Sequence, residues 1–326
     1  MSNLETEPEE LVCPPESPRG IELLEPRDVP LGGPRAMGVR RTLPQRARSL
    51  IGAWCFVDHY GPEAVRMDVP PHPHTGLQTV SWLFSGEIEH RDGVGSHAVI
   101  VPGGLNLMTA GRGIAHSEVS LDATPAPLLH GAQLWVALPD AHRNAPKAFQ
   151  HHEPTPVRVH GATLRVFLGS LAGQTSPVDT FTPLLGAEVT IDAGARVQLS
   201  LDPAYEHGVL ADSAGLAVNG TNVPRSAMAY LPTGTPTLQL TNGGDDKARA
   251  LLLGGPPFEE EIVMWWNFVG RSHDDIVAAR EEWMAHSARF GEVEGYAGEV
   301  QHLPAPPLPA VRIKPRANAS RPTRDS

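Results

Sequence analysis

Short runs of β-branched and aromatic residues recur along most of this chain, and Gly or Pro lies near most of their boundaries. Between about residues 38 and 140 they include AWCFVDHY, LQTVSWLF, HAVIV and AQLWVALP, and after about residue 156 they include VRVHGATLRVFLGSL, AEVTIDAGARVQLSL and TPTLQLTN. Short strands at this spacing are typical of β-sandwiches and β-barrels. The 32 Gly and 33 Pro make up about a fifth of the chain, which disfavours a helix bundle. Two such series predict an all-β protein with two domains of one style.

The chain divides into four parts on this pattern. We predict a first β-domain over residues 19–150 and a second over residues 151–300. Residues 1–18 are rich in Glu and Pro, and residues 301–326 are rich in Pro, Ala and Arg. Neither end has the apolar content that would offset the entropy of ordering it, so we expect both to be disordered tails.

One helix is expected late in the chain, over residues 272–290. Ser272 is a suitable N-cap, and Asp275 three residues later forms a variant of the capping box. The apolar residues of this segment recur at helical spacing and form one face. Trp283 and Met284 lie on that face, and we predict that both are packing residues.

Charge and cysteine content exclude several classes of protein. The formal net charge is −11, which disfavours direct binding to nucleic acid. The two cysteines, Cys13 and Cys55, are too few for a disulfide framework, and Cys55 lies in an apolar run where we expect inert packing. The first twenty residues lack the features of a signal peptide, and no run reaches the ~20 apolar residues of a membrane helix. We therefore expect a soluble, cytoplasmic protein with no membrane contact.

Two short motifs carry the chemistry. The first is His72-Pro73-His74, and the second is His116-Ser117-Glu118. Side chains at i and i+2 of a strand point to the same face, so each motif aims two donors in one direction. If the two strands are neighbours, four donors converge inside a barrel. Pro73 cannot donate to a central ladder, which places the first motif at a strand entrance or edge.

Three imidazoles and one carboxylate are a mixed nitrogen and oxygen ligand set. They lack the thiolates of many structural zinc sites and resemble the sites of non-haem iron, with manganese, nickel, cobalt or copper also feasible. A six-coordinate ion held by four protein groups keeps two positions open, as catalysis requires. The pattern therefore predicts a catalytic type of metal site.

Four segments together resemble the pirin family of bicupins. They are HPHTGLQTVSWLFSGEIEHRDGVGS, VPGGLNLMTAGRGIAHSE, HGAQLWVALPDAHR and GGPPFEEEIVMWWNFV, and the resemblance covers roughly residues 20–290. It implies two cupin β-barrels of the jelly-roll type placed face to face, with an iron ion, Fe²⁺, in the N-terminal barrel. The implied ligands are His72, His74, His116 and Glu118.

The resemblance implies two functions, and the sequence leaves both open. One is a quercetin 2,3-dioxygenase, in which a small flavonol-like substrate reacts with dioxygen. Glu118 would then be the catalytic residue, taking the proton of the flavonol 3-hydroxyl, and cleavage of the heterocycle would release carbon monoxide. The other is a non-enzymatic, redox-responsive regulator that binds a protein partner, either a transcription factor or a metabolic enzyme.

The second domain offers one candidate ligand, His207 in YEHGVL, with no second His two residues away. A lone His in a strand-rich domain is more often a core or surface residue than a ligand. We therefore expect the C-terminal barrel to bind no metal, which is also what the family resemblance implies.

Five further polar residues receive weaker interpretations. His59 is either support for a ligand imidazole or a partly exposed residue near a turn. Gln133 is a candidate for the lining of the metal cavity. Arg112 is expected to anchor a turn by pairing with a carboxylate, or to steer an anionic substrate. His90 and Asp92 are interpreted as polar residues of a hairpin, without a role at the site.

Overall fold

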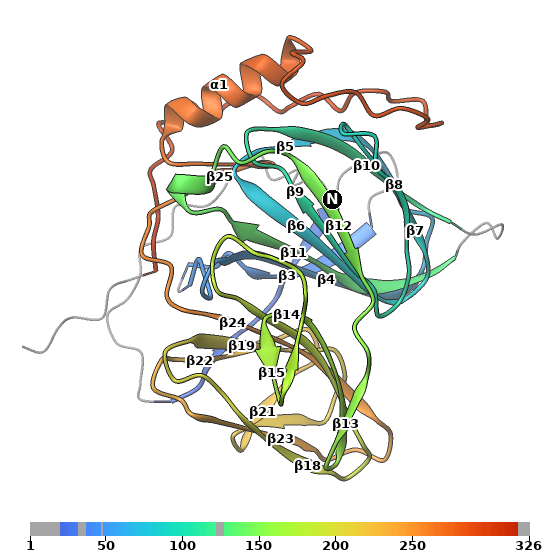
Figure 1. Cartoon of the computed structure of the whole chain (residues 1–326), viewed down its shortest axis with the longest axis vertical. Coiled ribbons are helices and arrows are strands. Elements are labelled where there is room, and N and C mark those ends of the chain that lie inside the picture. Colours follow the sequence, from blue (N-terminus) through green and yellow to red (C-terminus); the bar gives the residue numbers. More distant parts are fainter. Residues whose placement is uncertain (1–19, 32–36, 47, 122–126, 319–326) are drawn as a thin grey trace, which may run out of the picture.

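The computed structural model describes residues 20–31, 37–46, 48–121 and 127–318. Two β-barrels account for most of this part of the chain, and Figure 1 shows them stacked along the long axis of the molecule. The prediction of an all-β fold is confirmed. The described residues include no helix with the length and apolar character needed to cross a membrane. The expected tail at residues 1–18 lies outside the described residues.

The first barrel consists of a seven-stranded and a four-stranded antiparallel sheet. The larger sheet has the order β12 (Ala148–His152), β9 (Leu105–Thr109), β6 (Leu77–Ser85), β11 (Leu128–Ala137), β4 (Trp54–Ala64), β3 (Met37–Leu43) and β2 (Arg27–Leu31). The smaller sheet has the order β5 (Asp68–His74), β10 (Ile114–Ser120), β7 (Ile88–Asp92) and β8 (His97–Ile100). A short 3₁₀ turn, η1 (Asp140–His142), follows β11.

The second barrel repeats this arrangement. Its larger sheet has the order β1 (Glu22–Leu24), β22 (Met228–Leu231), β19 (Glu206–Ala211), β24 (Ala248–Gly255), β17 (Leu185–Ile191), β14 (Ala162–Leu168) and β13 (Val157–Val159). The smaller one has the order β18 (Arg196–Ser200), β23 (Thr237–Asn242), β20 (Leu216–Val218) and β21 (Thr221–Val223), and β15 (Ser170–Leu171) pairs with β16 (Gln174–Thr175). Inward-facing Val, Leu and Ala side chains of the two sheets form one buried cluster between them. β1 pairs with β22, so the second barrel receives its edge strand from the beginning of the chain.

A shared apolar layer joins the barrels. The buried cluster contains Trp54, Trp82 and Leu134 of the first barrel together with Phe167 and Leu251 of the second. The indole of Trp82 stacks on Phe167 with the ring centroids 4.4 Å apart. Its N–H donates across the interface to Glu188 at 2.9 Å. Burying the indoles while pairing their N–H groups makes this contact both apolar and specific in orientation.

The end of the second domain returns to the first barrel. The hairpin of β25 (Val263–Trp265) and β26 (Phe268–Gly270) precedes α1 (His273–Met284), and Figure 1 shows α1 over the first barrel, above β25 and β5. The backbone N–H of Val269 donates to the carbonyl of Thr75 at 2.9 Å, directly after β5. This segment therefore covers the barrel that carries both sequence motifs.

Helix α1 begins as predicted and ends earlier. The capping box of Ser272 and Asp275 is confirmed, with both reciprocal hydrogen bonds present. The predicted end at residue 290 is wrong, because His286 adopts a φ of 55°. The backbone N–H of His286 donates to the carbonyl of Trp283, and that of Ser287 donates to the carbonyl of Glu282. This pattern is a Schellman motif, which stops a helix. Trp283 is buried as predicted, whereas Met284 is 40 % exposed.

Residues 301–318 do not form the expected disordered tail. The N–H of Leu303 donates to the carbonyl of Pro71 at 2.8 Å, and Ala305 is buried in the cluster that contains Trp283. Leu308 and Ile313 pack against the same cluster. Farther along, the side chain of Asn318 accepts from the backbone N–H of Leu50 at 2.9 Å. Composition alone missed this docking because the tail packs on apolar surface that α1 and the first barrel supply.

Candidate metal centre

The first motif lies on the edge strand of the smaller sheet. Among the described residues, β5 pairs only with β10 in the sheet order, so its other edge donates to no ladder there. Its sequence is DVPPHPH, and an edge strand accommodates proline because the missing N–H is not needed there. The prediction that Pro73 places His72 and His74 at a strand edge is confirmed.

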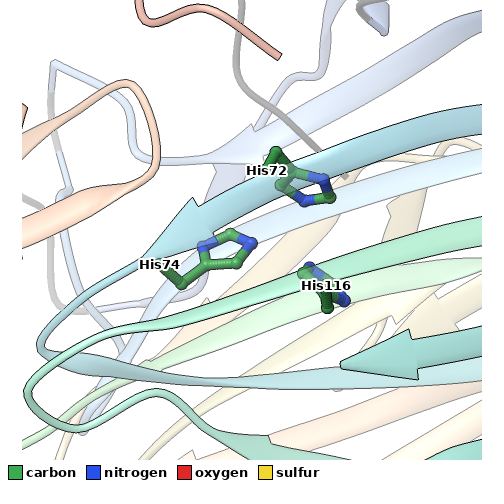
Figure 2. Close-up of side chains that lie close together, drawn as sticks. All are labelled: His72, His74 and His116. Carbon is green, nitrogen blue, oxygen red and sulfur yellow. The ribbon is translucent and has the colours of Figure 1, made fainter. Parts of the chain in front are cut away.

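The register of β5 and β10 brings the two motifs together. His116 lies directly opposite His72, and Ile114 lies opposite His74. The centroids of the three imidazole rings are 5.1 Å apart for His72 and His74, 4.3 Å for His72 and His116, and 5.0 Å for His74 and His116. Figure 2 shows the three rings converging from the two strands. Nitrogen atoms of the three rings lie within 4.8 Å of one another.

The three imidazoles are neutral, and their free nitrogens are suited to bind a cation. All are fully buried, and the Nε2 atoms of His72, His74 and His116 have no hydrogen-bond partner among the described residues. Burial lowers the pKa of His72 to about 3. Burial, reinforced by the neighbouring imidazoles, holds the pKa values of His74 and His116 well below the usual range. Neutral rings with free lone pairs are the form that binds a metal ion, and buried polar atoms without partners call for one.

Glu118 lies beside this group in an overlapping cluster. Its carboxylate, His116 and His90 present ligand atoms within 4.8 Å of one another. A register shift in the β5–β10 ladder falls between His116 and Glu118. The hydroxyl of Ser81 on β6 donates to Glu118 Oε1 at 3.1 Å. The structure therefore brings all four predicted ligand residues to one buried region, with the carboxylate held from the opposite sheet.

Gln133 contacts Ser81, the residue that holds the Glu118 carboxylate. Its amide oxygen is placed 2.9 Å from the Ser81 hydroxyl, and its amide nitrogen has no partner among the described residues. One hydroxyl proton cannot serve two acceptors. With the amide turned over, its N–H donates to Ser81 while Ser81 donates to Glu118, so the Ser81 hydroxyl accepts one hydrogen bond and donates the other. Gln133 then supports Glu118 from β11.

Comparison with known proteins decides the family. The pirin family model matches residues 36–136, and the model of the pirin C-terminal cupin domain matches residues 186–291. A Pseudomonas aeruginosa protein provisionally named quercetin 2,3-dioxygenase is 44% identical over 303 residues, covering 91% of this chain and 93% of the relative. The chain belongs to the pirin family.

Solved structures agree with this assignment. The crystal structure of a quercetin 2,3-dioxygenase from Acinetobacter baumannii is 39% identical, with a TM-score of 0.84, and covers 92% of this chain and 98% of that one. A bacterial pirin from Escherichia coli, solved in complex with nickel(II), shares the fold at 16% identity and a TM-score of 0.56, covering 73% of this chain and 100% of that one. The pirin fold predicted for this chain, two cupin barrels face to face, is confirmed.

In this pirin, His59 does not support a ligand imidazole, and it is not partly exposed. It is fully buried on β4 and faces the second barrel. Its Nε2 lies 2.8 Å from Asp212 Oδ1, and its Nδ1 lies 2.8 Å from the hydroxyl of Ser226. The ring of His130 contacts the same carboxylate oxygen, with its Nε2 2.5 Å away. The side chain of His59 thus joins the barrels, which the sequence could not show because its partner lies 153 residues away.

The other weaker candidates lie apart from the metal ligands. Arg112 is exposed, and no carboxylate pairs with its side chain among the described residues; its carbonyl accepts from Arg289 instead. Cys55 is buried as predicted, and burial raises the pKa of its thiol to about 12. His207 is buried on β19, and neither ring nitrogen has a partner in the described part of the chain.

The sequence did not predict that His90 and Asp92 lie beside the candidate metal ligands. Both are buried on β7, where Asp92 lies opposite His116 and His90 lies opposite Glu118. The spacing of His90 and Asp92 is again i, i+2, so the alternation that revealed the ligand motifs also applied here. What the sequence could not supply was the order of strands, which places β7 next to β10.

Proposed function

We propose that this pirin is a metal-dependent dioxygenase of the quercetin 2,3-dioxygenase type, acting on a flavonol-like substrate. One observation carries the proposal. Three buried, neutral imidazoles have unpartnered Nε2 atoms, and ring nitrogens of the three lie within 4.8 Å of one another beside a buried glutamate. The names of a 44% identical relative and of a 39% identical solved structure support this reaction class.

His72, His74, His116 and Glu118 are the residues that would hold the metal ion. Three neutral nitrogens and one carboxylate suit Fe²⁺, which we propose as the native ion, and other divalent first-row metals are compatible with the same donors. When bound, the ion would act as a Lewis acid toward the flavonol and bring dioxygen next to it.

Glu118 is the group in this site that can accept the proton of the flavonol 3-hydroxyl. Its Oε1 receives the Ser81 hydroxyl hydrogen bond, which fixes the orientation of the carboxylate. The three imidazoles cannot serve as bases while their Nε2 lone pairs bind a metal ion. The deprotonated, electron-rich flavonol then reacts with dioxygen. The heterocycle opens, one carbon leaves as carbon monoxide, and both atoms of dioxygen enter the products.

Buried side chains surround the ligands and exclude water. Trp135 meets His74 edge to face with the ring centroids 5.1 Å apart, and it stacks on Phe56 at 4.0 Å. The backbone of Asn267, between β25 and β26, lies against His74. Aromatic walls of this kind fix the ring of a ligand and keep the site dry, which strengthens every electrostatic interaction inside it.

Aerobic turnover of quercetin by iron-loaded protein tests the proposal. Loss of flavonol absorbance should be accompanied by release of one carbon monoxide per flavonol. The variant with all four ligands changed to alanine is the blank and should show neither. Wild-type protein with a full complement of iron and no flavonol cleavage would refute the enzyme. That result would favour the redox-responsive regulator instead.

A further inference from the structure

The two residues of β7 that face the metal ligands form a chain of contacts ending at His116. His90 Nδ1 lies 3.4 Å from His116 Nδ1, and His90 Nε2 lies 3.1 Å from Asp92 Oδ2. All three side chains are buried. This series of contacts leads from Asp92, through His90, to the ring of His116, whose free Nε2 faces the proposed metal ion.

The carboxylate at the start of this chain is fixed in position. Asp92 Oδ1 accepts from the backbone N–H groups of Val94 and Ser96, each at 3.0 Å. Its other oxygen therefore remains for His90. The His90 ring is held from its face by Phe149, with ring centroids 4.6 Å apart and planes 24° apart.

For a neutral His90, the contacts permit one assignment of protons. An ionised carboxylate only accepts, so the proton of neutral His90 is on Nε2. His90 Nδ1 then carries a lone pair and accepts, which requires a proton on His116 Nδ1. The lone pair of His116 is consequently on Nε2, the atom that has no partner among the described residues. His90 uses both of its nitrogens in this chain, which argues against His90 as a metal ligand itself.

We propose that Asp92 and His90 are positioning residues that fix the tautomer and orientation of His116 and increase the electron density at its Nε2. The inference rests on the proposed metal site and goes beyond it by naming what tunes that site. Hydrogen bonding of a ligand histidine to a carboxylate raises its basicity, and loss of such partners typically lowers metal affinity about 10–100-fold. A stronger donor also favours the more oxidised ion, so the chain lowers the midpoint potential of bound iron.

The test compares four variants with wild type. His90→Phe keeps an aromatic ring against Phe149 and removes the acceptor, and Asp92→Asn removes the charge at the start of the chain. His90→Gln restores an acceptor for His116 Nδ1. His97→Phe is the matched control, because His97 lies on neighbouring β8 with its side chain 52% exposed, paired with Glu89. The readouts are the affinity for Fe²⁺, measured by chelator competition, and the midpoint potential of bound iron.

We expect His90→Phe to bind Fe²⁺ about 10–100-fold more weakly and with a raised potential. Asp92→Asn should move both quantities in the same direction, His90→Gln should recover part of the loss, and His97→Phe should match wild type. Affinity and potential unchanged in folded His90→Phe would overturn the inference while leaving the metal site intact. Variants that are unfolded without metal, by circular dichroism, would show a purely structural role and overturn it as well. Wild-type protein that binds no metal would refute the proposed function and the inference together.

Discussion

His72 and His116 face each other directly across the β5–β10 pair, with their ring centroids 4.3 Å apart. The Nδ1 atom of each ring makes a hydrogen-bond contact. His72 Nδ1 lies 2.9 Å from the carbonyl oxygen of Pro70, and His116 Nδ1 contacts His90. Both Nε2 atoms are consequently left for a cation. The pair is the fixed centre of the site, and His74 and Glu118 complete it from the same two strands.

Loss of His74 should remove most of the metal without unfolding the protein. Two separate apolar clusters, one inside the second barrel and one between the barrels, supply most of the buried core, and neither includes a metal ligand. His74→Ala should therefore keep the wild-type circular dichroism spectrum while its metal content, by mass spectrometry, falls well below one ion per chain. His160→Ala, an exposed position in the second barrel, is the control. A globally unfolded His74→Ala variant would mean that the site is structural.

Glu118→Gln separates the carboxylate as a ligand from the carboxylate as a base. An amide oxygen still coordinates weakly and three imidazoles remain, so part of the metal should stay bound. General-base catalysis is typically worth ~10²–10⁴-fold, so turnover of quercetin per bound metal ion should fall by at least about a hundredfold. Rates are compared after the metal content of each sample has been measured. Wild-type turnover in the metal-loaded variant would refute this role for Glu118.

Removal of residues 302–326 should destabilise the protein. The deleted segment includes Leu303, whose carbonyl accepts from the Trp283 indole N–H at 2.8 Å, and Pro306, whose carbonyl accepts from Arg280 at 2.7 Å. A fully buried Leu contributes about 1.5–3 kcal/mol, and Leu303 and Leu308 are partly buried, so we expect the melting temperature to fall by a few degrees. A chain ending at Asn318 keeps these contacts and is the control. Equal melting temperatures for the two truncated chains would contradict the docking of residues 302–318.

His207 should make the protein sensitive to acid. Burial lowers the pKa of His207 to about 4, against an ordinary value near 6.5, so between these values the unfolded chain takes up a proton that the folded chain refuses. The free energy of unfolding should consequently decrease as the pH falls through this window, by about 1.4 kcal/mol per pH unit for this group. In urea unfolding between pH 7 and 4.5, metal-free His207→Leu should have a slope smaller by this amount than metal-free wild type, and both keep the slope that the buried His72, His74 and His116 contribute. Parallel pH profiles for the two proteins would exclude His207 as the cause.

Alternation along a strand was sufficient to predict the pairs His72/His74 and His116/Glu118, because the side-chain period of a strand is fixed by its geometry. Pro73 correctly indicated an edge strand. Alternation gives the face of a strand but not its neighbours, so the contacts of His90 with His116 and of His59 with Asp212 could not be foreseen. The same limit applies to β1, which comes before the strands of the first barrel in the sequence and pairs with β22 of the second barrel.

The end of α1 and the course of residues 301–318 were missed for a different reason. Apolar periodicity continues past Met284, but the left-handed conformation of His286 ends the helix. Histidine is not a residue type that predicts a helix end. The Pro-rich segment has no periodicity of its own, and it becomes ordered by packing on Trp283 and on the backbone of β5. The course of the Pro-rich segment depends on tertiary contacts that local sequence does not encode.

Labelled dioxygen tests the central claim most directly. Iron-loaded wild-type protein should convert quercetin under ¹⁸O₂ to a ring-opened product that carries two ¹⁸O atoms, with one unlabelled carbon monoxide released for each flavonol consumed. The variant with His72, His74, His116 and Glu118 all changed to alanine should yield neither. Fully loaded wild-type protein that gives no doubly labelled product would contradict the assignment of this site as a dioxygenase centre.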